Sequence, residues 1–318
     1  MPRTKRPPDE GRLIQLVYYA YVAFSAFARF LPERIAYGIA SGLGSLGARR
    51  RTARRRNLER NLARVTGFSP GSDELERLVR DAYRSYARYW LETFRLVREG
   101  PEFFLERFRC IGKENLDGVM ERGRGAIVVV GHLGNWDAAG AWVGATGRQL
   151  VTVAEMLRPR RMFEFFAAHR AALGMTIFAA EAGVTDRLVR AVDDGAVVAI
   201  LGDRDLRGRG PKVEFFGEVT TFPAGPASVA LRAKVPLLVG GVFGEVFEDG
   251  RRGWTAHIGP PIELPVDSPD PIQDLTEEVA KQLGEHIRAR PEEWHVLQPV
   301  WPADRGNDGA EGQKKGGP

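Results

Sequence analysis

The spacing of apolar side chains changes character near residue 111. From 13 to 110 the apolar positions recur at helical intervals, most clearly over 72–95, where Leu75 and Leu78 share a face and Ser72 is placed to cap the helix. Beyond this point short β-rich runs alternate with helical stretches. The runs are 126–130, 150–154, 196–201, 236–243 and 254–258, and the helical stretches are 138–146, 162–173, 184–192, 226–234 and 271–290.

This alternation predicts an α/β fold with a mostly parallel or mixed central sheet flanked by helices, preceded by an N-terminal helical segment that associates with a membrane. Four regions follow. We expect a disordered N-terminus at 1–12, a helical membrane-associating region at 13–110, an α/β core at 111–304 and a disordered Gly-rich tail at 305–318.

The run 13–28 carries no charge and ends at Arg29. As a helix it is roughly 24 Å long, shorter than the ~30 Å hydrocarbon core of a bilayer. A second amphipathic stretch and the arginine-rich block 49–56 follow, which favours an interfacial anchor on an anionic leaflet. Two alternatives stay open: a secretory signal, because Lys5 and Arg6 precede the run, and ordinary core helices with a solvated charged face.

Composition narrows the classes of function. The 318 residues are 43% hydrophobic, enough for one large domain or two modest ones, and the formal net charge is +5. No aromatic side chains are interleaved with the arginine block, so the sequence does not favour nucleic acid as a partner. The single cysteine, Cys110, excludes an intramolecular disulfide and a cysteine-based zinc site. A nucleophile elbow, a phosphate-binding P-loop and a dinucleotide fingerprint are all missing from the sequence.

The first candidate site is Gly131–Asp137, directly after the apolar run 126–130. Open α/β sheets bind ligands at the carboxyl ends of their strands, which is where His132 is expected. A helix starting near Gly134 would let Asp137 fold back onto the imidazole and fix its tautomer. The pair is typical of a general base acting on a hydroxyl, and the alternative is a structural histidine at a strand end.

A second cluster, Asp203, Arg204 and Asp205, follows the run 196–201. Asp-x-Asp also suits the metal and nucleotide-sugar site of a glycosyltransferase, or a capping turn with a local ion pair. A third interpretation makes the chain a non-catalytic binder of membranes or nucleic acid through its arginine block.

Two further side chains stand near predicted strand ends. Glu155 follows the run 150–154, and Arg170 belongs to an aromatic-rich helix. Such an arginine binds phosphate in some proteins and reaches out to solvent in others.

In their order and spacing these motifs resemble the lipid A biosynthesis acyltransferase family over roughly residues 13–304, and within it the actinobacterial branch that acts on phosphatidylinositol mannosides. The motifs are Gly131–Asp137, Ala154–Glu155, Asp203–Leu206, Phe215–Glu218, Ala224–Ala227 and Trp294–Pro299.

The resemblance implies transfer of a fatty acyl chain from acyl-CoA to a mannose hydroxyl of a phosphatidylinositol mannoside, at the cytoplasmic face of the inner membrane, by a peripheral or monotopic protein. The implied partners are acyl-CoA as co-substrate, a glycolipid acceptor and an anionic membrane surface, with no cofactor, metal or nucleic acid. A lipid A-type or other glycolipid acceptor is the alternative within this class.

The resemblance also implies roles for single residues. His132 would be the general base, Asp137 its orienter, and Asp203 would help hold either His132 or the acceptor. The position of Asp203 is typically glutamate in mycobacterial members, so its shorter side chain places its reach in question. The implied substrate-binding residues are Asn135, Glu155, Arg170, Arg204 and Asp205.

Overall fold

The computed structural model describes residues 19, 21, 25–156 and 160–305. The expectations for 1–12, for most of the apolar run 13–28 and for nearly all of the tail 305–318 lie outside these residues. Arg305, the first residue of the expected tail, ends a short helix, α12 (Pro302–Arg305).

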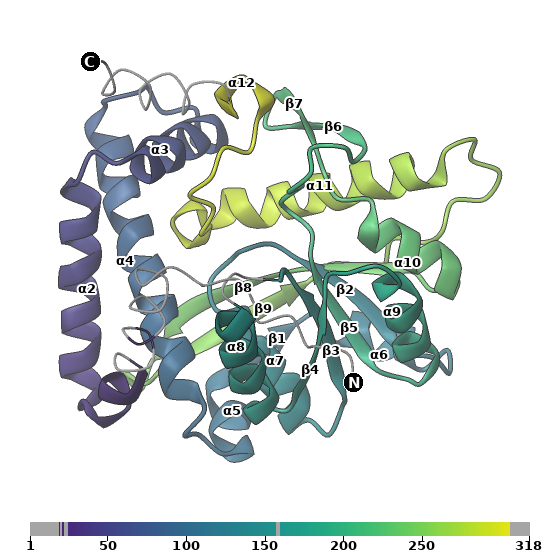
Figure 1. The fold of residues 1–318 in the computed structure, drawn as a ribbon, viewed down its shortest axis with the longest axis horizontal. Coiled ribbons are helices and arrows are strands. Elements are labelled where there is room, and N and C mark those ends of the chain that lie inside the picture. The colour runs from purple at the N-terminus through teal and green to yellow at the C-terminus, as the bar shows by residue number, and fades with distance from the viewer. Residues whose placement is uncertain (1–18, 20, 22–24, 157–159, 306–318) are drawn as a thin grey trace, which may run out of the picture.

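A seven-stranded mixed sheet forms the centre of the fold (Figure 1), in the order β1-β9-β8-β2-β5-β3-β4. All neighbouring strands are parallel except β8 and β9, which form an antiparallel pair. The predicted mostly parallel α/β architecture is therefore confirmed. The strands are β1 (Phe108–Ile111), β2 (Ala126–Val130), β3 (Leu150–Ala154), β4 (Met175–Ala179), β5 (Val197–Leu201), β8 (Leu237–Val246) and β9 (Arg252–Ile258).

Helices cover both faces of the sheet, because its central strands are apolar on both sides. One face carries α9, α10 and α11, and the other carries α5, α6 and α7, with α8 beside β4. Each face has its own buried apolar cluster. The helices are α5 (Pro101–Arg107), α6 (Lys113–Met120), α7 (Trp136–Ala145), α8 (Arg160–Ala172), α9 (Val184–Asp193), α10 (Gly225–Ala233) and α11 (Pro271–Ala289), followed by a short 3₁₀ turn, η1 (Pro291–Glu293).

Several features were not predicted from the apolar pattern. Strand β1 overlaps the end of the region expected to be helical, α6 and β4 were not anticipated, and β6 (Lys212–Phe215) pairs with β7 (Glu218–Thr221) in a separate hairpin. Strand β1 has only four residues, too few for its alternation of less and more exposed positions to stand out in the sequence. Its conformation is therefore set by parallel pairing with β9, a long-range contact that local periodicity does not report.

The N-terminal helices α2 (Glu33–Arg49), α3 (Ala53–Thr66) and α4 (Asp73–Leu96) stand beside the sheet (Figure 1). Ser72 caps α4 by accepting a hydrogen bond from the amide of Leu75, as predicted. Helix α2 packs along α4 so closely that a Cβ at Gly44 would lie 2.7 Å from the Cα of Arg84. Glycine is therefore required where the two helices cross.

The outer face of α2 is apolar and exposed. Its large hydrophobic side chains recur at intervals of three and four, at Ile35, Ile39, Leu43 and Leu46, with 41% to 54% of each exposed. We call these four residues the α2 stripe. Across the part of the chain that the structure describes, no helix combines the length and apolar character needed to cross a bilayer.

Candidate active site

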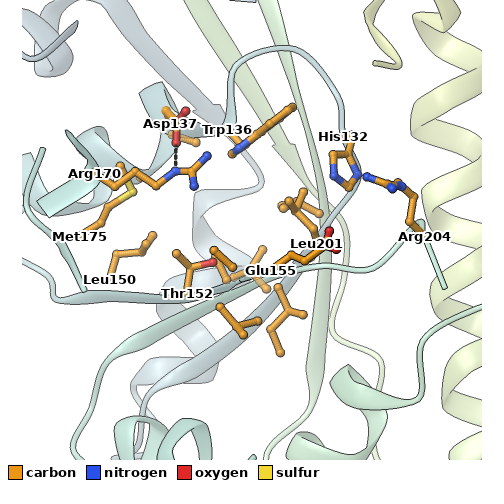
Figure 2. A pocket seen from close by; sticks show the side chains of 18 of the residues that line it. His132, Trp136, Asp137, Leu150, Thr152, Glu155, Arg170, Met175, Leu201 and Arg204 are labelled. Atoms are coloured by element: carbon orange, nitrogen blue, oxygen red, sulfur yellow. Dashed lines mark hydrogen bonds and ion pairs between the residues drawn. The ribbon is translucent and has the colours of Figure 1, made fainter. Parts of the chain in front are cut away.

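The predicted site residues cluster at the carboxyl edge of the sheet, where β2, β3 and β5 end side by side. A cavity of about 1040 Å³ opens at this edge and is lined by His132 after β2, Glu155 after β3 and Arg204 after β5. Figure 2 shows these side chains around the cavity, with Asp137 and Arg170 on its opposite side. The adjacency of the three strands thus brings together residues that are up to 72 positions apart.

His132 is held by Asp203. Its ring Nδ1 lies 2.6 Å from Asp203 Oδ1, and its backbone amide donates to Asp203 Oδ2 at 2.9 Å. The loop that carries it turns at Gly134, which has φ +54°, and a Cβ there would lie 2.2 Å from the carbonyl oxygen of Val242. The His132 side chain is 17% exposed and lines the cavity, and the contact with Asp203 occupies its Nδ1.

Asp203 is fully buried and ionised. Burial raises the pKa of this carboxyl, but neighbouring His132 and hydrogen bonds from His132 and Trp294 lower it by more, so the pKa lies below its ordinary value. A carboxylate at Nδ1 stabilises the tautomer in which that nitrogen carries the proton. Nε2 is then the nitrogen that is free to accept a proton from a substrate.

The expected contact between Asp137 and His132 is wrong. Helix α7 begins at Trp136 rather than near Gly134, and Asp137, in its first turn, lies across the cavity from the imidazole (Figure 2). Its carboxylate instead accepts from Arg170 Nε at 2.6 Å, from the hydroxyl of Tyr89 at 3.2 Å and from the hydroxyl of Thr93 at 3.3 Å.

Arg170 therefore forms an ion pair with Asp137 and also lines the cavity. Burial lowers the pKa of its guanidinium, but the adjacent Asp137 carboxylate raises it by more, so the group stays charged. The guanidinium reaches the cavity beside Trp136, whose buried indole nitrogen has no hydrogen-bond partner among the described residues.

Asn135 does not belong to the cavity wall. Its amide oxygen caps α7 by accepting from the amide of Ala138 at 3.0 Å, and its amide nitrogen donates to Glu92 Oε2 at 3.0 Å. Glu92 is buried and also accepts from the hydroxyl of Tyr37 and from the indole of Trp254. The expected substrate contact is therefore replaced by a role in fixing the start of the helix that follows His132.

Asp205 likewise does not line the cavity and instead bonds to the protein backbone. Its carboxylate accepts from the amides of Arg207 at 3.1 Å and Gly210 at 2.7 Å and so closes a loop, as the capping-turn alternative expected. Asp203 and Asp205 thus have separate partners rather than a shared metal site. The described residues contain no group of three or more His, Cys, Asp or Glu side chains arranged to hold a metal ion.

Comparison with known proteins identifies the family. The family model described as bacterial lipid A biosynthesis acyltransferase matches residues 7–302, nearly the whole chain. The chain belongs to this acyltransferase family. The chain is 34% identical over 307 residues to a phosphatidylinositol mannoside acyltransferase of Mycolicibacterium smegmatis, covering 96% of each protein. It is 32% identical over 293 residues to the protein of that name from Mycobacterium tuberculosis, covering 90% of this chain and 89% of the relative.

One residue of this candidate site in the acyltransferase was not singled out from the sequence. His295 lines the cavity, and its Nε2 lies 2.8 Å from the hydroxyl of Ser85, which itself donates to Glu293. Burial, followed by the charge of Arg88, holds the pKa of His295 well below its usual range, so the ring is neutral. Its Nδ1 has no partner among the described residues. The sequence feature that could have identified His295 is the motif Trp294–Pro299, which contributes to the family resemblance but to whose histidine no role was assigned.

The deep part of the cavity in this acyltransferase is apolar. It runs between α7 and the sheet, where small residues leave space: Ala199 on β5, Gly240 on β8 and Ala256 on β9 form part of the floor. Trp142 and Val143 of α7 form part of the opposite wall. The cavity therefore joins a polar mouth at the strand ends to an apolar interior.

Proposed function

We propose that this acyltransferase moves a fatty acyl chain from acyl-CoA to a mannose hydroxyl of a phosphatidylinositol mannoside at the cytoplasmic face of the membrane, with His132 as general base. The observation that carries the proposal is the hydrogen bond between His132 Nδ1 and Asp203 at the mouth of an apolar cavity. The names of the relatives, which align over nearly the whole chain, support the choice of acceptor.

The chemistry requires one proton acceptor. Nε2 of His132 takes the proton of the sugar hydroxyl as the hydroxyl oxygen attacks the thioester carbonyl carbon. The carbon–sulfur bond then breaks, and the imidazolium returns the proton to the departing thiolate of CoA. Asp203 stabilises the imidazolium between the two steps. In this scheme neither a metal nor a covalent enzyme intermediate is needed.

The apolar interior suits the acyl chain of the donor. Alkyl chains gain about 0.8 kcal/mol for each methylene that leaves water, so a long chain binds strongly in a groove of this kind. A chain lying between α7 and the sheet floor at Ala199 and Gly240 would bring its thioester to the strand ends, where His132 lies.

The polar mouth suits a hydroxyl-rich acceptor. Buried polar atoms are nearly always hydrogen-bonded, so unpaired ones at a cavity indicate contacts made by a ligand. Trp136 offers an unpaired indole N–H, and neutral His295 offers an unpaired acceptor at Nδ1. The guanidinium of Arg170, like the Trp136 N–H, can donate to hydroxyl or phosphate oxygens. The carboxylate of Glu155, like His295 Nδ1, can accept from hydroxyl groups.

The α2 stripe supports peripheral attachment to a bilayer. It lies on the outside of the molecule, away from α4, and the exposed arginines 49–51 follow directly after it. Apolar side chains beside clustered cations are typical of helices that lie on an anionic lipid surface. Attachment there would bring the enzyme to an acceptor that is itself a membrane lipid.

Replacing Ile39 and Leu43 together by serine is expected to weaken binding to anionic phospholipid vesicles roughly ten- to thirty-fold, since each half-exposed side chain contributes about 1 kcal/mol of transfer free energy. Vesicle co-sedimentation measures the change. The matched control replaces Val219 and Val266, which are also exposed, and should bind as wild type. Equal losses in both double variants would contradict an α2 contact.

The proposed reaction is tested by offering palmitoyl-CoA to the purified protein with phosphatidylinositol dimannoside, with a lipid A precursor, or with no acceptor. CoA release and the acylated lipid are measured together. We expect both to require the mannoside. Transfer to the lipid A precursor alone would overturn the acceptor, and absence of thioester cleavage with every lipid would overturn the donor.

A further inference from the structure

The segment that follows α11 returns to the loop that carries His132. Two backbone hydrogen bonds and an antiparallel bridge join residues 293–295 to residues 132–134. The amide of His295 donates to the carbonyl of His132 at 2.8 Å, the amide of Gly134 donates to the carbonyl of Glu293 at 3.0 Å, and Leu133 pairs with Trp294. The histidine loop is thereby fixed by residues about 160 positions away.

Trp294 also reaches the histidine's partner. Its side chain is fully buried, and its indole Nε1 donates to Asp203 Oδ2 at 2.9 Å. The amide of His132 donates to the same oxygen at 2.9 Å, while Oδ1 lies on His132 Nδ1 at 2.6 Å. Both oxygens of the carboxylate are therefore assigned to particular donors.

We propose that Trp294 is a positioning residue: its indole N–H fixes the rotation of the Asp203 carboxylate so that Oδ1 stays on His132 Nδ1. The inference rests on the proposed role of His132 as base. The terminal torsion of an aspartate has broad minima, so a carboxylate whose Oδ2 accepts only from the His132 amide keeps freedom to turn about its bond to Cβ and loosen the contact at Oδ1. A second donor on Oδ2 removes that freedom before substrate arrives.

The chain supplies its own control. Trp301 is also fully buried, and its indole donates to the carbonyl of Phe215 at 3.2 Å rather than to Asp203. Trp294→Phe and Trp301→Phe therefore remove the same atoms from similar surroundings, and only the first removes a donor from the carboxylate. We expect Trp294→Phe to lower kcat about tenfold with KM for palmitoyl-CoA within twofold, and Trp301→Phe to leave kcat unchanged.

The pH profile separates positioning from a loss of stability. Removing a donor to the carboxylate anion favours the protonated pair, so the acid limb of kcat should move to higher pH in Trp294→Phe and stay in place in Trp301→Phe. The charged or titratable groups around the cavity mouth are unchanged in both variants. They are Arg54 of α3, Tyr86 and Tyr89 of α4, Asp137 of α7, Glu155 after β3, Arg170 of α8, Glu181 after β4, Arg204 and Arg207 after β5, His257 of β9, His295 of the C-terminal segment, and Tyr21.

A measurement on the unaltered enzyme covers the case in which Trp294→Phe does not fold. With ¹⁵N-labelled tryptophan, the indole proton of Trp294 should titrate with the same midpoint as the acid limb of activity, and that of Trp301 should not. Superimposable acid limbs for the two variants, or a Trp294 indole that does not respond to pH, would overturn the inference. His132→Ala with normal turnover would instead overturn the proposed base, so the two failures are distinguishable.

Discussion

His132→Ala is expected to lower kcat for acyl transfer by about 10²- to 10⁴-fold, the usual contribution of a positioned general base. Without the imidazole, the sugar hydroxyl must attack the thioester while still protonated. The fold should persist, because the His132 side chain is partly exposed at a cavity mouth and its backbone contacts do not depend on the ring. Turnover of palmitoyl-CoA and thermal unfolding of the same preparation measure both expectations.

Asp203→Asn belongs to the same experiment. An amide at this position would no longer stabilise the imidazolium, so Asp203→Asn should also lower kcat. The double variant with His132→Ala should lose little more kcat than either single variant, since the two residues act as a unit. The control is His286→Gln on α11, which removes a histidine outside the cavity lining. Additive losses in the double variant, or a comparable loss in His286→Gln, would exclude the pair as the catalytic base.

Arg170→Met is expected to lower the free energy of unfolding by about 3 kcal/mol. Removing one partner of a buried ion pair leaves an uncompensated charge, which costs about 3–5 kcal/mol, and the lower end applies because the Arg170 side chain retains 18% exposure. Among the described residues, the carboxylate of Asp137, only 1% exposed, would keep two neutral donors, Tyr89 and Thr93. Urea unfolding followed by tryptophan fluorescence measures the change.

A second substitution identifies the cause. Asp137→Asn in the Arg170→Met background removes the stranded charge and should recover at least half of the lost stability. As a matched control, Arg160→Met on the same helix breaks only the exposed pair with Glu164 and should change the unfolding free energy by less than about 1 kcal/mol. Equal changes in unfolding free energy for Arg170→Met and Arg160→Met would show that burial of the ion pair between Arg170 and Asp137 does not contribute to stability.

The sequence predicted that candidate site residues meet at one edge of the sheet, and the structure brings them together there, because that prediction depends only on local order. His132, Glu155 and Asp203 each follow an apolar run, and parallel strands end on one edge. The partner of His132 could not be assigned in the same way. It depends on β5 lying directly beside β2, a matter of strand order, and on α7 beginning two residues later than expected.

The residues that the pattern overlooked are those whose surroundings come from distant segments. His295 and Trp294 follow a short 3₁₀ turn near the end of the chain, and no local periodicity links them to His132. Asn135 was misassigned for a related reason: a buried asparagine before a helix serves equally well as a cap or a ligand until its neighbours are known. Here the amide nitrogen of Asn135 donates a hydrogen bond to Glu92 on α4.

The return of residues 293–295 to the histidine loop also constrains when the enzyme becomes active during its synthesis. Until His295 has left the ribosome, the loop at His132 lacks its backbone partners and Asp203 lacks the indole of Trp294. Strand β2 also pairs with β8 on its second edge, and this pairing requires that β8 has been synthesised. A nascent chain, or one cut short before residue 293, therefore carries every strand of the seven-stranded sheet but lacks contacts that hold the His132 loop and the Asp203 carboxylate, and on the proposed mechanism we expect it to transfer acyl chains more slowly than the full chain.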